Sequence, residues 1–170
     1  KENDKKPRRN IILSVGRLEE EKDHLTLINS FEIISKLYKD WDLHIIGEGK
    51  LKNKLNNKIN SLGLIDRISI KGFTRDIGSK YREAKIFAIP SKYEAFGLVT
   101  AEAMSFGIPC IGFADCPGTN ELITNGENGL LVKKSKNRTL SLAEALERLI
   151  SDEQYRICLG RAAREKINKI

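Results

Sequence analysis

Short apolar runs alternate with segments of helical periodicity along this chain, and this alternation constrains the fold more than any other feature of the sequence. Each run has the length and composition of a buried strand. The predicted strands cover residues 11–15, 42–46, 68–71, 86–89, 110–113 and 129–132. Strands that alternate with helices imply right-handed crossovers. We therefore expect an α/β fold, a doubly wound parallel sheet of about six strands with helices on both faces.

The segments between the strands carry apolar side chains at helical spacing. The clearest sets, after the first two strands and after the last one, are Leu25, Ile28, Phe31, Ile34 and Tyr38; Leu51, Leu55, Ile59 and Leu62; and Leu142, Leu146, Leu149 and Ile150. Residues 152–170 are polar and are expected to form a last helix with little core of its own. In a sheet of this kind ligands bind outside the carboxyl ends of the strands, so the loops that follow the strands are the candidate functional segments.

The 170 residues are enough for one hydrophobic core. We expect a linker arm at residues 1–9, the doubly wound domain at 10–151 and a C-terminal helix at 152–170. The first nine residues lack the apolar region of a secretory signal, and no apolar run approaches the ~20 residues that a membrane-spanning helix needs. These features favour the cytoplasm.

The net charge of +7 raises the question of an anionic partner. Five cations and two anions fall within the first nine residues, so this arm carries +3 and the other 161 residues carry +4. The remaining Lys and Arg are spread among Asp and Glu, which favours a solvated lysine-rich surface over a nucleic-acid site. We expect no nucleic-acid partner.

Residues that could bind a metal are sparse and dispersed. Three cysteines and two histidines show no metal-ligand spacing, and the odd cysteine count argues against a disulfide framework. An Asp-x-Asp tripeptide, a common metal-binding pattern in enzymes that use sugar nucleotides, occurs at Asp40-Trp41-Asp42. It precedes the second predicted strand and so lies at the wrong edge of the sheet. We expect no metal and no cofactor.

The loop after the first strand carries two cations. Gly16 permits a tight strand exit, Arg17 and Lys22 supply positive charge, and Asp23 stands where a helix N-cap is expected. An Arg fork, a Lys charge and helix amides together suit a diphosphate. The alternative is a pair of surface cations that face Glu19, Glu20 and Glu21.

The loop after the second strand, Gly47-Glu48-Gly49-Lys50, lacks the spacing of a phosphate-binding Walker sequence. It suits either a wall for a base or ribose, or a plain tight turn. No G-x-G-x-x-G follows the first strand, which weakens a nicotinamide or flavin hypothesis.

The strongest segment runs from Pro90 to Phe113, where a strand ends, a loop follows and a helix begins near Leu98 or Val99. Glu94 and Glu102 are separated by seven residues. Glu94 is expected in the loop at the ligand edge, and Glu102 on the first turns of the helix, facing the same crevice. A carboxylate there can accept two hydrogen bonds from a vicinal diol such as ribose. The alternative is that both glutamates only stabilise a helix N-terminus.

Five segments in order, SVGRLEEEKDHLTLI, HIIGEGK, KGFT, IPSKYEAFGLVTAEAMSFGIPCI and PGTNELITNGENGLLV, resemble the C-terminal domain of group 1 (family 4) glycosyltransferases. The match covers about residues 10–132. The resemblance implies the Rossmann-like half of a GT-B fold, a retaining and metal-independent hexosyltransferase type of enzyme, and a donor sugar nucleotide bound by residues 10–151. It also implies a separate N-terminal domain for the acceptor, without which this fragment is expected to be inactive.

By position, the resemblance assigns the donor diphosphate to Arg17 and Lys22, which follow Gly16 in the first loop. Glu94 would contact hydroxyls of the transferred sugar, and Glu102 would bind the ribose. The backbone amides of Phe96, Gly97 and Leu98 would bind the phosphates and the sugar. Gly47 and Phe73 would lie beside the base. With Arg17 and Lys22, Glu94 is the candidate catalytic residue. Two residues depart from the family pattern: Ala95 stands where glycine is common, and Phe106 stands where a small residue is usual. Ala95 is expected to narrow the sugar pocket.

The PGTNELITNGENGLLV segment is similar to versions in enzymes that build capsular, lipopolysaccharide or exopolysaccharide chains, which suggests a cell-envelope polysaccharide. The basic balance permits contact with the inner face of the membrane. Two alternatives remain at this stage. One is a non-catalytic nucleotide-binding module that serves a partner chain. The other is an oxidoreductase or epimerase, which the missing dinucleotide glycines disfavour.

Overall fold

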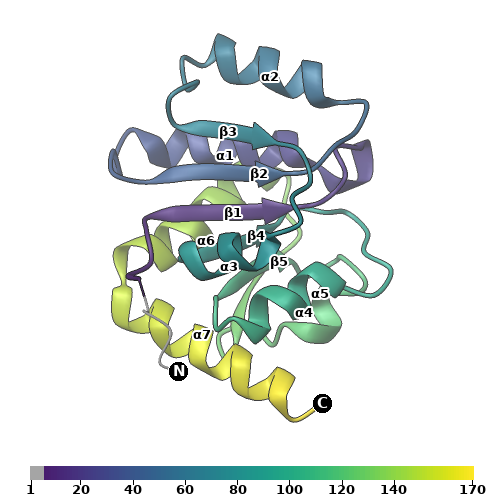
Figure 1. The fold of residues 1–170 in the computed structure, drawn as a ribbon, viewed down its shortest axis with the longest axis vertical. Helices are drawn as coiled ribbons and strands as arrows, with labels where there is room; N and C mark the ends of the chain where they lie inside the picture. The colour runs from purple at the N-terminus through teal and green to yellow at the C-terminus, as the bar shows by residue number, and fades with distance from the viewer. Residues whose placement is uncertain (1–5) are drawn as a thin grey trace.

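A six-stranded parallel sheet forms the centre of the computed structural model, which describes residues 6–170 (Figure 1). The strands lie in the order β3-β2-β1-β4-β5-β6, and every neighbouring pair is parallel. Their bounds are β1 Ile11–Val15, β2 Asp42–Ile46, β3 Ile68–Lys71, β4 Ile86–Ile89, β5 Cys110–Phe113 and β6 Gly129–Val132. The doubly wound fold and all six predicted strand ranges are confirmed.

Seven α-helices and one 3-10 turn lie between and after the strands of the described chain. They are η1 Glu20–Lys22, α1 His24–Ser35, α2 Lys52–Ser61, α3 Ile77–Glu83, α4 Leu98–Ser105, α5 Thr119–Leu122, α6 Arg138–Ser151 and α7 Glu153–Asn168. Tyr38 lies beyond the end of α1, so the helix predicted from Leu25, Ile28, Phe31, Ile34 and Tyr38 was too long at its C-terminal end. The short helices α3 and α5 had no counterpart among the predicted elements.

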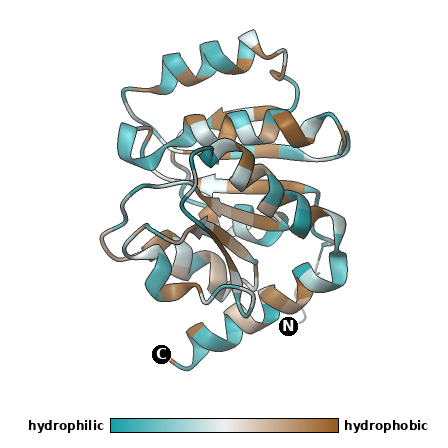
Figure 2. Ribbon diagram, turned by 180° about the vertical axis from the view of Figure 1, so that it is seen from behind, coloured by the Kyte–Doolittle hydropathy of each residue, from teal (hydrophilic) through white to brown (hydrophobic). Residues whose placement is uncertain are grey.

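Two hydrophobic cores lie on opposite faces of the sheet. Consecutive residues of β1 alternate between them: Ile12 belongs to the core under α1, α2 and α6, whereas Ile11 and Leu13 belong to the core under α3, α4 and α7. Strand residues that are buried on both faces of a sheet are mostly apolar, which makes the central strands stand out in the sequence. Figure 2 shows these apolar strands at the centre and hydrophilic residues on the outer sides of the helices.

The C-terminal helix has more core than its sequence indicates. α7 packs against α4 and α6 and buries Arg156, Leu159, Gly160 and Ala163. Arg156 is 5% exposed, and its guanidinium donates to the carbonyls of Leu149 and Ile150 at the end of α6. Arg156, which the sequence alone suggests is a surface residue, therefore connects the last two helices by hydrogen bonds.

The described part of the predicted linker arm is joined to the domain. Arg8 donates to the backbone carbonyls of Tyr81, Arg82 and Ala84 at the end of α3, and to the carbonyl of Phe106 at the end of α4. A guanidinium there satisfies carbonyls that helix ends leave without partners. Residues 1–5 of the predicted arm lie outside the described residues.

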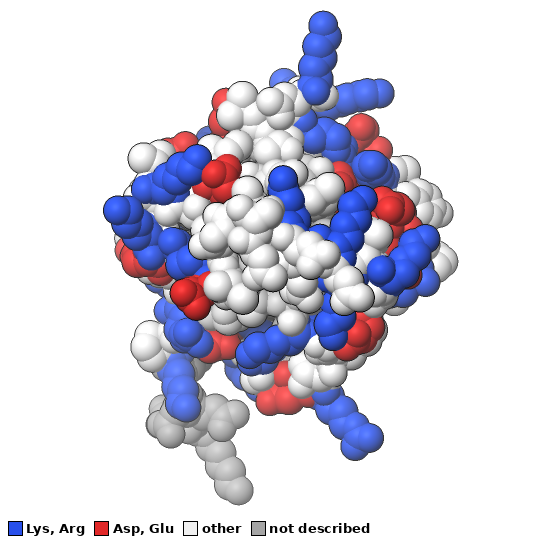
Figure 3. Space-filling model, turned by 90° about the horizontal axis from the view of Figure 1, so that it is seen from above, with Lys and Arg blue, Asp and Glu red and all other residues white. Residues whose placement is uncertain are grey.

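Positive and negative side chains are interspersed over the face that Figure 3 shows. This mixture fits the solvated surface expected from the sequence. None of the helices in residues 6–170 combines the length and the apolar content that crossing a bilayer requires.

Candidate functional site

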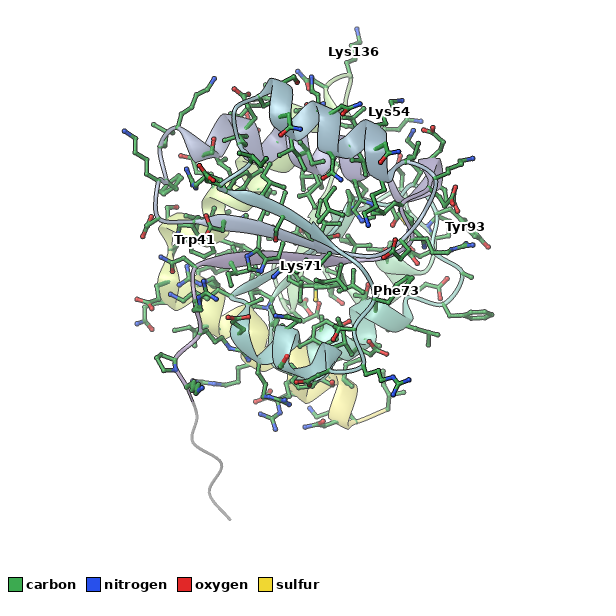
Figure 4. All side chains as sticks on the ribbon, turned by 45° about the horizontal axis from the view of Figure 1, so that its top comes forward. Trp41, Lys54, Lys71, Phe73, Tyr93 and Lys136 are labelled. Carbon is green, nitrogen blue, oxygen red and sulfur yellow. The ribbon has the colours of Figure 1, made fainter. Side chains whose placement is uncertain are left out.

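A pocket of about 310 Å³ opens at the carboxyl end of the sheet. It lies beside the topological switch point between β1 and β4, where the strand order reverses. It is lined by the end of β1, the loops after β1, β3 and β4, and the start of α4: Val15, Gly16, Arg17, Lys22, Phe73, Glu94, Ala95, Phe96, Gly97, Leu98 and Val99. This is where open α/β sheets bind ligands. Figure 4 shows Phe73 and Tyr93 at this end of the sheet and Trp41 at the opposite end.

The two cations of the first loop differ in their surroundings. The Lys22 side chain is 17% exposed, and its ammonium lies 2.8 Å from a carboxyl oxygen of Glu94. The Arg17 side chain is 69% exposed and lies 3.6 Å from Glu21, one helical turn along the chain. Lys22 is therefore held in place before any ligand arrives, whereas Arg17 is free to swing from Glu21 toward an anion.

Asp23 occupies the N-cap position of α1, as predicted, but its side chain does not accept a backbone N–H. Its carboxylate instead accepts from the Thr26 hydroxyl at 2.7 Å and lies 3.5 Å from Arg138. Asp23 has a left-handed backbone, with φ of 50°. That conformation turns its carboxylate toward the α6 side of the loop.

Glu94 is the buried carboxylate of the pocket, with 8% of its surface exposed. One oxygen, Oε1, accepts from the Lys22 ammonium at 2.8 Å and from the Ser91 hydroxyl at 2.6 Å. Both bonds converge on the same oxygen, so the second oxygen keeps its lone pairs for a ligand. Charge-assisted hydrogen bonds of this kind fix the carboxylate and compensate for its burial.

The loop that carries Glu94 rests on the loop after β5. The Glu94 amide donates to the carbonyl of Pro117, and Gly118 lies so close that a Cβ on it would sit 2.3 Å from the Glu94 carbonyl oxygen. Gly118 also has φ of 82°, a conformation that side chains disfavour. The segment PGTN, singled out from the sequence, thus supports Glu94 through backbone contact.

Glu102 lies on α4, one turn after Leu98 and Val99, and does not line the pocket. It is exposed, and its Oε2 accepts from the hydroxyl of Tyr81 at 2.9 Å. The placement on the first turns of the helix agrees with the sequence-based expectation. Its position one turn below the pocket wall puts it beside, rather than inside, the space that Glu94 borders.

Gly47 also stands outside the pocket lining, but it supports the first loop. A Cβ on Gly47 would lie 1.9 Å from the carbonyl oxygen of Gly16, so only glycine permits this approach of the two loops. Phe73 does line the pocket and is 62% exposed. Phe96 and Leu98, at 81% and 68%, are further apolar side chains left open at the same edge.

Three residues that sequence reasoning missed organise this edge. Ser91 holds Glu94, Tyr81 holds Glu102, and Arg138 spans several loops. The Arg138 guanidinium donates to the Pro90 carbonyl, lies near Asp23 and Asp115, and stacks 3.6 Å from the centre of the Phe113 ring. Ser91 stood inside the segment already singled out, whereas Tyr81 and Arg138 come from helices with no functional signal of their own.

His24 lies beneath the first loop and is 2% exposed. Burial, and secondarily the charge of Lys22, lowers the pKa of His24 to about 4. Its Nδ1 has no hydrogen-bond partner within the described structure. A neutral imidazole at neutral pH leaves Lys22 and Arg17 as the cations of this loop.

Among residues 6–170, no group of three or more His, Cys, Asp or Glu side chains is arranged to hold a metal ion. Asp42 begins β2, at the amino edge of the sheet, and pairs with Arg67 at 3.1 Å, while Asp40 accepts from Asn10. The Asp-x-Asp tripeptide therefore lies opposite the pocket, as its sequence position predicts. The thiols of Cys110, Cys116 and Cys158 are free.

A family model for group 1 glycosyl transferases matches residues 1–166 of the sequence. The chain belongs to this family. It is 31% identical, over 145 residues, to a Campylobacter jejuni N-acetylgalactosamine-N,N'-diacetylbacillosaminyl-diphospho-undecaprenol 4-alpha-N-acetylgalactosaminyltransferase, a match that covers 85% of this chain and 38% of the relative. The chain spans less than half of the length of these curated relatives, for example 38% of the Campylobacter protein and 40% of an uncharacterized glycosyltransferase from Haemophilus influenzae.

Two solved structures of glycosyltransferases share the fold. S. aureus TarM, in a complex with UDP among other ligands, is 26% identical with a TM-score of 0.89, over 95% of this chain and 32% of TarM. The C-terminal domain of a group 1 family protein, LpcC from Francisella tularensis, is 28% identical with a TM-score of 0.84, over 98% of this chain and 88% of that one. The second structure is a domain of similar extent that was crystallised by itself.

Proposed function

We propose that this chain is the donor-binding domain of a retaining, metal-independent glycosyltransferase that moves a sugar from a nucleoside-diphosphate sugar to a glycan or lipid-linked acceptor. The observation that carries the proposal is the pocket at the carboxyl end of the sheet, where Arg17, Lys22 and Glu94 meet the start of α4. Two cations and helix amides suit a diphosphate, and the buried carboxylate suits sugar hydroxyls. The UDP in the TarM complex supports a nucleotide donor.

Each group has one role in the proposed reaction. Lys22 and Arg17 bind the diphosphate and stabilise the negative charge that develops on it as the glycosidic bond breaks. Amides of Phe96, Gly97 and Leu98 assist at the phosphates and sugar. Glu94 orients the transferred sugar through its second carboxyl oxygen. The acceptor is proposed to attack from the face that the diphosphate vacates, so that the anomeric configuration is retained.

The nucleoside is proposed to lie toward the loops after β2 and β3. Phe73 offers an exposed ring beside the base, and Gly47 keeps the loop after β2 against the first loop. Glu102 is proposed to accept hydrogen bonds from the ribose hydroxyls. An upstream domain is proposed to bind the acceptor, because the chain spans less than half of the length of its curated relatives.

Similarity to a relative supports a proposal for the acceptor class and the location. The Campylobacter relative is named for an undecaprenol-linked acceptor, which supports a lipid-linked glycan and a role in cell-envelope polysaccharide synthesis. Such an acceptor lies at the membrane, so we propose that the enzyme works in the cytoplasm at the inner face of the membrane. The net positive charge of the chain permits contact with anionic lipids there.

Calorimetric titration of the chain with UDP, GDP and ADP, with and without a chelator, tests the proposal. We expect at least one diphosphate to bind with an affinity that the chelator does not change. Arg17→Ala should weaken binding about 10-fold or more, because a charge-assisted hydrogen bond contributes about 1.5–3 kcal/mol. Lys36→Ala is the matched control, since Lys36 forms an exposed pair with Glu32 one helical turn away, on α1. Binding that disappears in chelator would sink the metal-independent mechanism.

A further inference from the structure

Tyr81 is a buried tyrosine whose hydroxyl has a single described partner. It lies on α3, is 0% exposed and belongs to the core between α3, α4 and the sheet. Its ring stacks on Phe106 at 5.3 Å between centroids and packs against Phe87 at 5.7 Å. The ring is thus held between two aromatic side chains, which fixes the direction of its hydroxyl.

The hydroxyl is directed at the carboxylate of Glu102. It donates to Oε2 at 2.9 Å. Burial, together with the charge of Glu102, raises the pKa of Tyr81 above its usual range, so the phenol keeps its proton and remains a donor. Only one carboxyl oxygen is used, and the other can accept from a ligand.

The two helices that carry this pair are braced against each other. Arg8 donates to the carbonyls of Tyr81 and Phe106, which lie on α3 and at the end of α4 respectively. A glutamate on a helix surface otherwise samples several rotamers, and ordering it costs free energy when a ligand binds. A rigid donor beneath Glu102 removes part of that cost before binding.

We propose that Tyr81 is a positioning residue of the donor site, which holds the Glu102 carboxylate in the orientation that accepts hydrogen bonds from ribose hydroxyls. The inference rests on the proposed function. Tyr81 does not touch the ligand, and it acts only through Glu102. Its effect is therefore confined to the part of the affinity that depends on the ribose hydroxyls.

The test compares a nucleoside diphosphate with its 2′,3′-dideoxy counterpart by calorimetry, using UDP as the first probe and GDP or ADP if either binds more tightly. The wild-type chain should prefer the ordinary nucleotide at least 10-fold. Tyr81→Phe retains the stacked ring and should reduce this preference at least threefold. Glu102→Ala should abolish it. The preference is a ratio within each variant, so a lower folded fraction affects both affinities alike and cancels.

Two controls separate positioning from a structural role. Tyr38→Phe removes a hydrogen bond of the same kind, from Tyr38 to Glu147 at 3.2 Å on the other face of the sheet, and should leave the preference unchanged. In the Glu102→Ala background, Tyr81→Phe should cause no further loss of affinity. A structural role would instead lower affinity in both backgrounds.

The outcomes also separate this inference from the proposed function. A wild-type chain that binds no nucleoside diphosphate would overturn both. A wild-type chain that binds and prefers the ribose form, with Tyr81→Phe retaining the full preference, would overturn the role of Tyr81 alone. A further affinity loss from Tyr81→Phe in the Glu102→Ala background would also overturn it, because Tyr81 would then act without Glu102.

Discussion

At the scale of single residues, the candidate site holds its charged groups in pairs. Lys22 and Glu94 neutralise each other in a nearly buried contact, with side chains 17% and 10% exposed. An ammonium carries three donors, so Lys22 can keep this bond and still meet a phosphate oxygen. The pair therefore joins the proposed diphosphate and sugar sites.

His24 makes the stability of the domain sensitive to acid. Its folded pKa of about 4 lies below the ordinary value of 6.5, so the unfolded chain binds the proton more tightly. The stability that the neutral imidazole preserves is complete above pH 6.5 and is lost as the pH falls toward 4. A pKa difference of this size corresponds to about 3 kcal/mol.

Urea unfolding at pH 7 and pH 4.5 checks this expectation. Wild type should lose stability between the two pH values by more than His24→Asn does, since the variant lacks the titrating group. The difference between the two proteins isolates His24 from the carboxylates, which titrate in both. Equal losses in wild type and variant would contradict the assignment.

At the scale of secondary-structure elements, the sequence predicted all six strands to the residue, because each is a short run rich in Ile, Leu, Val or Phe and four of the six are followed directly by glycine or proline. Helix α3 was missed. It has seven residues, only Tyr81 is buried, and Gly78 lies in its first turn. A helix this short has no periodicity to read. It forms because Asp76 caps it and Tyr81 docks into a core made by distant segments.

In the candidate site, too, contacts between segments that are distant in the sequence could not be predicted. The loops and their charged residues could be found from the sequence, because they follow predicted strands. The hydroxyl of Tyr81 could not be assigned to Glu102, because 21 positions separate them and only the packing of α3 on α4 joins them. Arg138 is similar: as the first residue of α6 it reads as a surface cation, yet its side chain reaches Pro90 and Asp23.

The contact of α7 with α4 depends on Gly160. A Cβ there would lie 2.3 Å from the carbonyl oxygen of Gly107 and 3.1 Å from Pro109 Cδ. Alanine usually stabilises a helix interior by about 0.5–1 kcal/mol relative to glycine. Here the backbone neighbour cannot yield without displacing α7, so Gly160→Ala should lower the free energy of unfolding by about 1–3 kcal/mol.

Gly78→Ala in α3 is the matched control for Gly160→Ala. Its added Cβ would come 3.3 Å from the Arg82 guanidinium, which is the flexible end of an exposed side chain. We therefore expect no loss of stability. Thermal denaturation of both variants beside wild type provides the comparison. A Gly160→Ala protein as stable as Gly78→Ala would show that α7 is not closely packed at this point.

At the scale of the whole molecule, the fold separates its two ends. The carboxyl end of the sheet carries glycine-rich loops, cations and exposed apolar side chains, whereas the amino end carries Asp42 and Arg67 in a structural pair. One face of the pocket is open, and Phe73, Phe96 and Leu98 remain exposed around it. A donor bound here would stay in contact with water unless a second domain closes over it.

This open geometry leads to an expectation for residues 1–170 alone. The chain should fold, as the LpcC domain of similar extent does, and should bind a nucleoside diphosphate, yet transfer no sugar. Catalysis by positioning needs both reactants in one frame, a contribution of roughly 7–11 kcal/mol that a donor site without an acceptor site lacks. Closure would also exclude water and strengthen the interactions of Lys22 and Arg17 with the leaving diphosphate.

The measurement is release of nucleoside diphosphate and transfer of labelled sugar, with a panel of sugar nucleotides and lipid-linked or glycan acceptors. Residues 1–170 should show neither above background, and supplying an acceptor-binding domain upstream or in trans should produce transfer. Glu94→Ala should abolish that transfer while diphosphate binding persists, because Glu94 is assigned to the sugar and Lys22 and Arg17 to the phosphates. Transfer by residues 1–170 alone, abolished by Glu94→Ala, would place the complete active site within this chain and refute the two-domain mechanism.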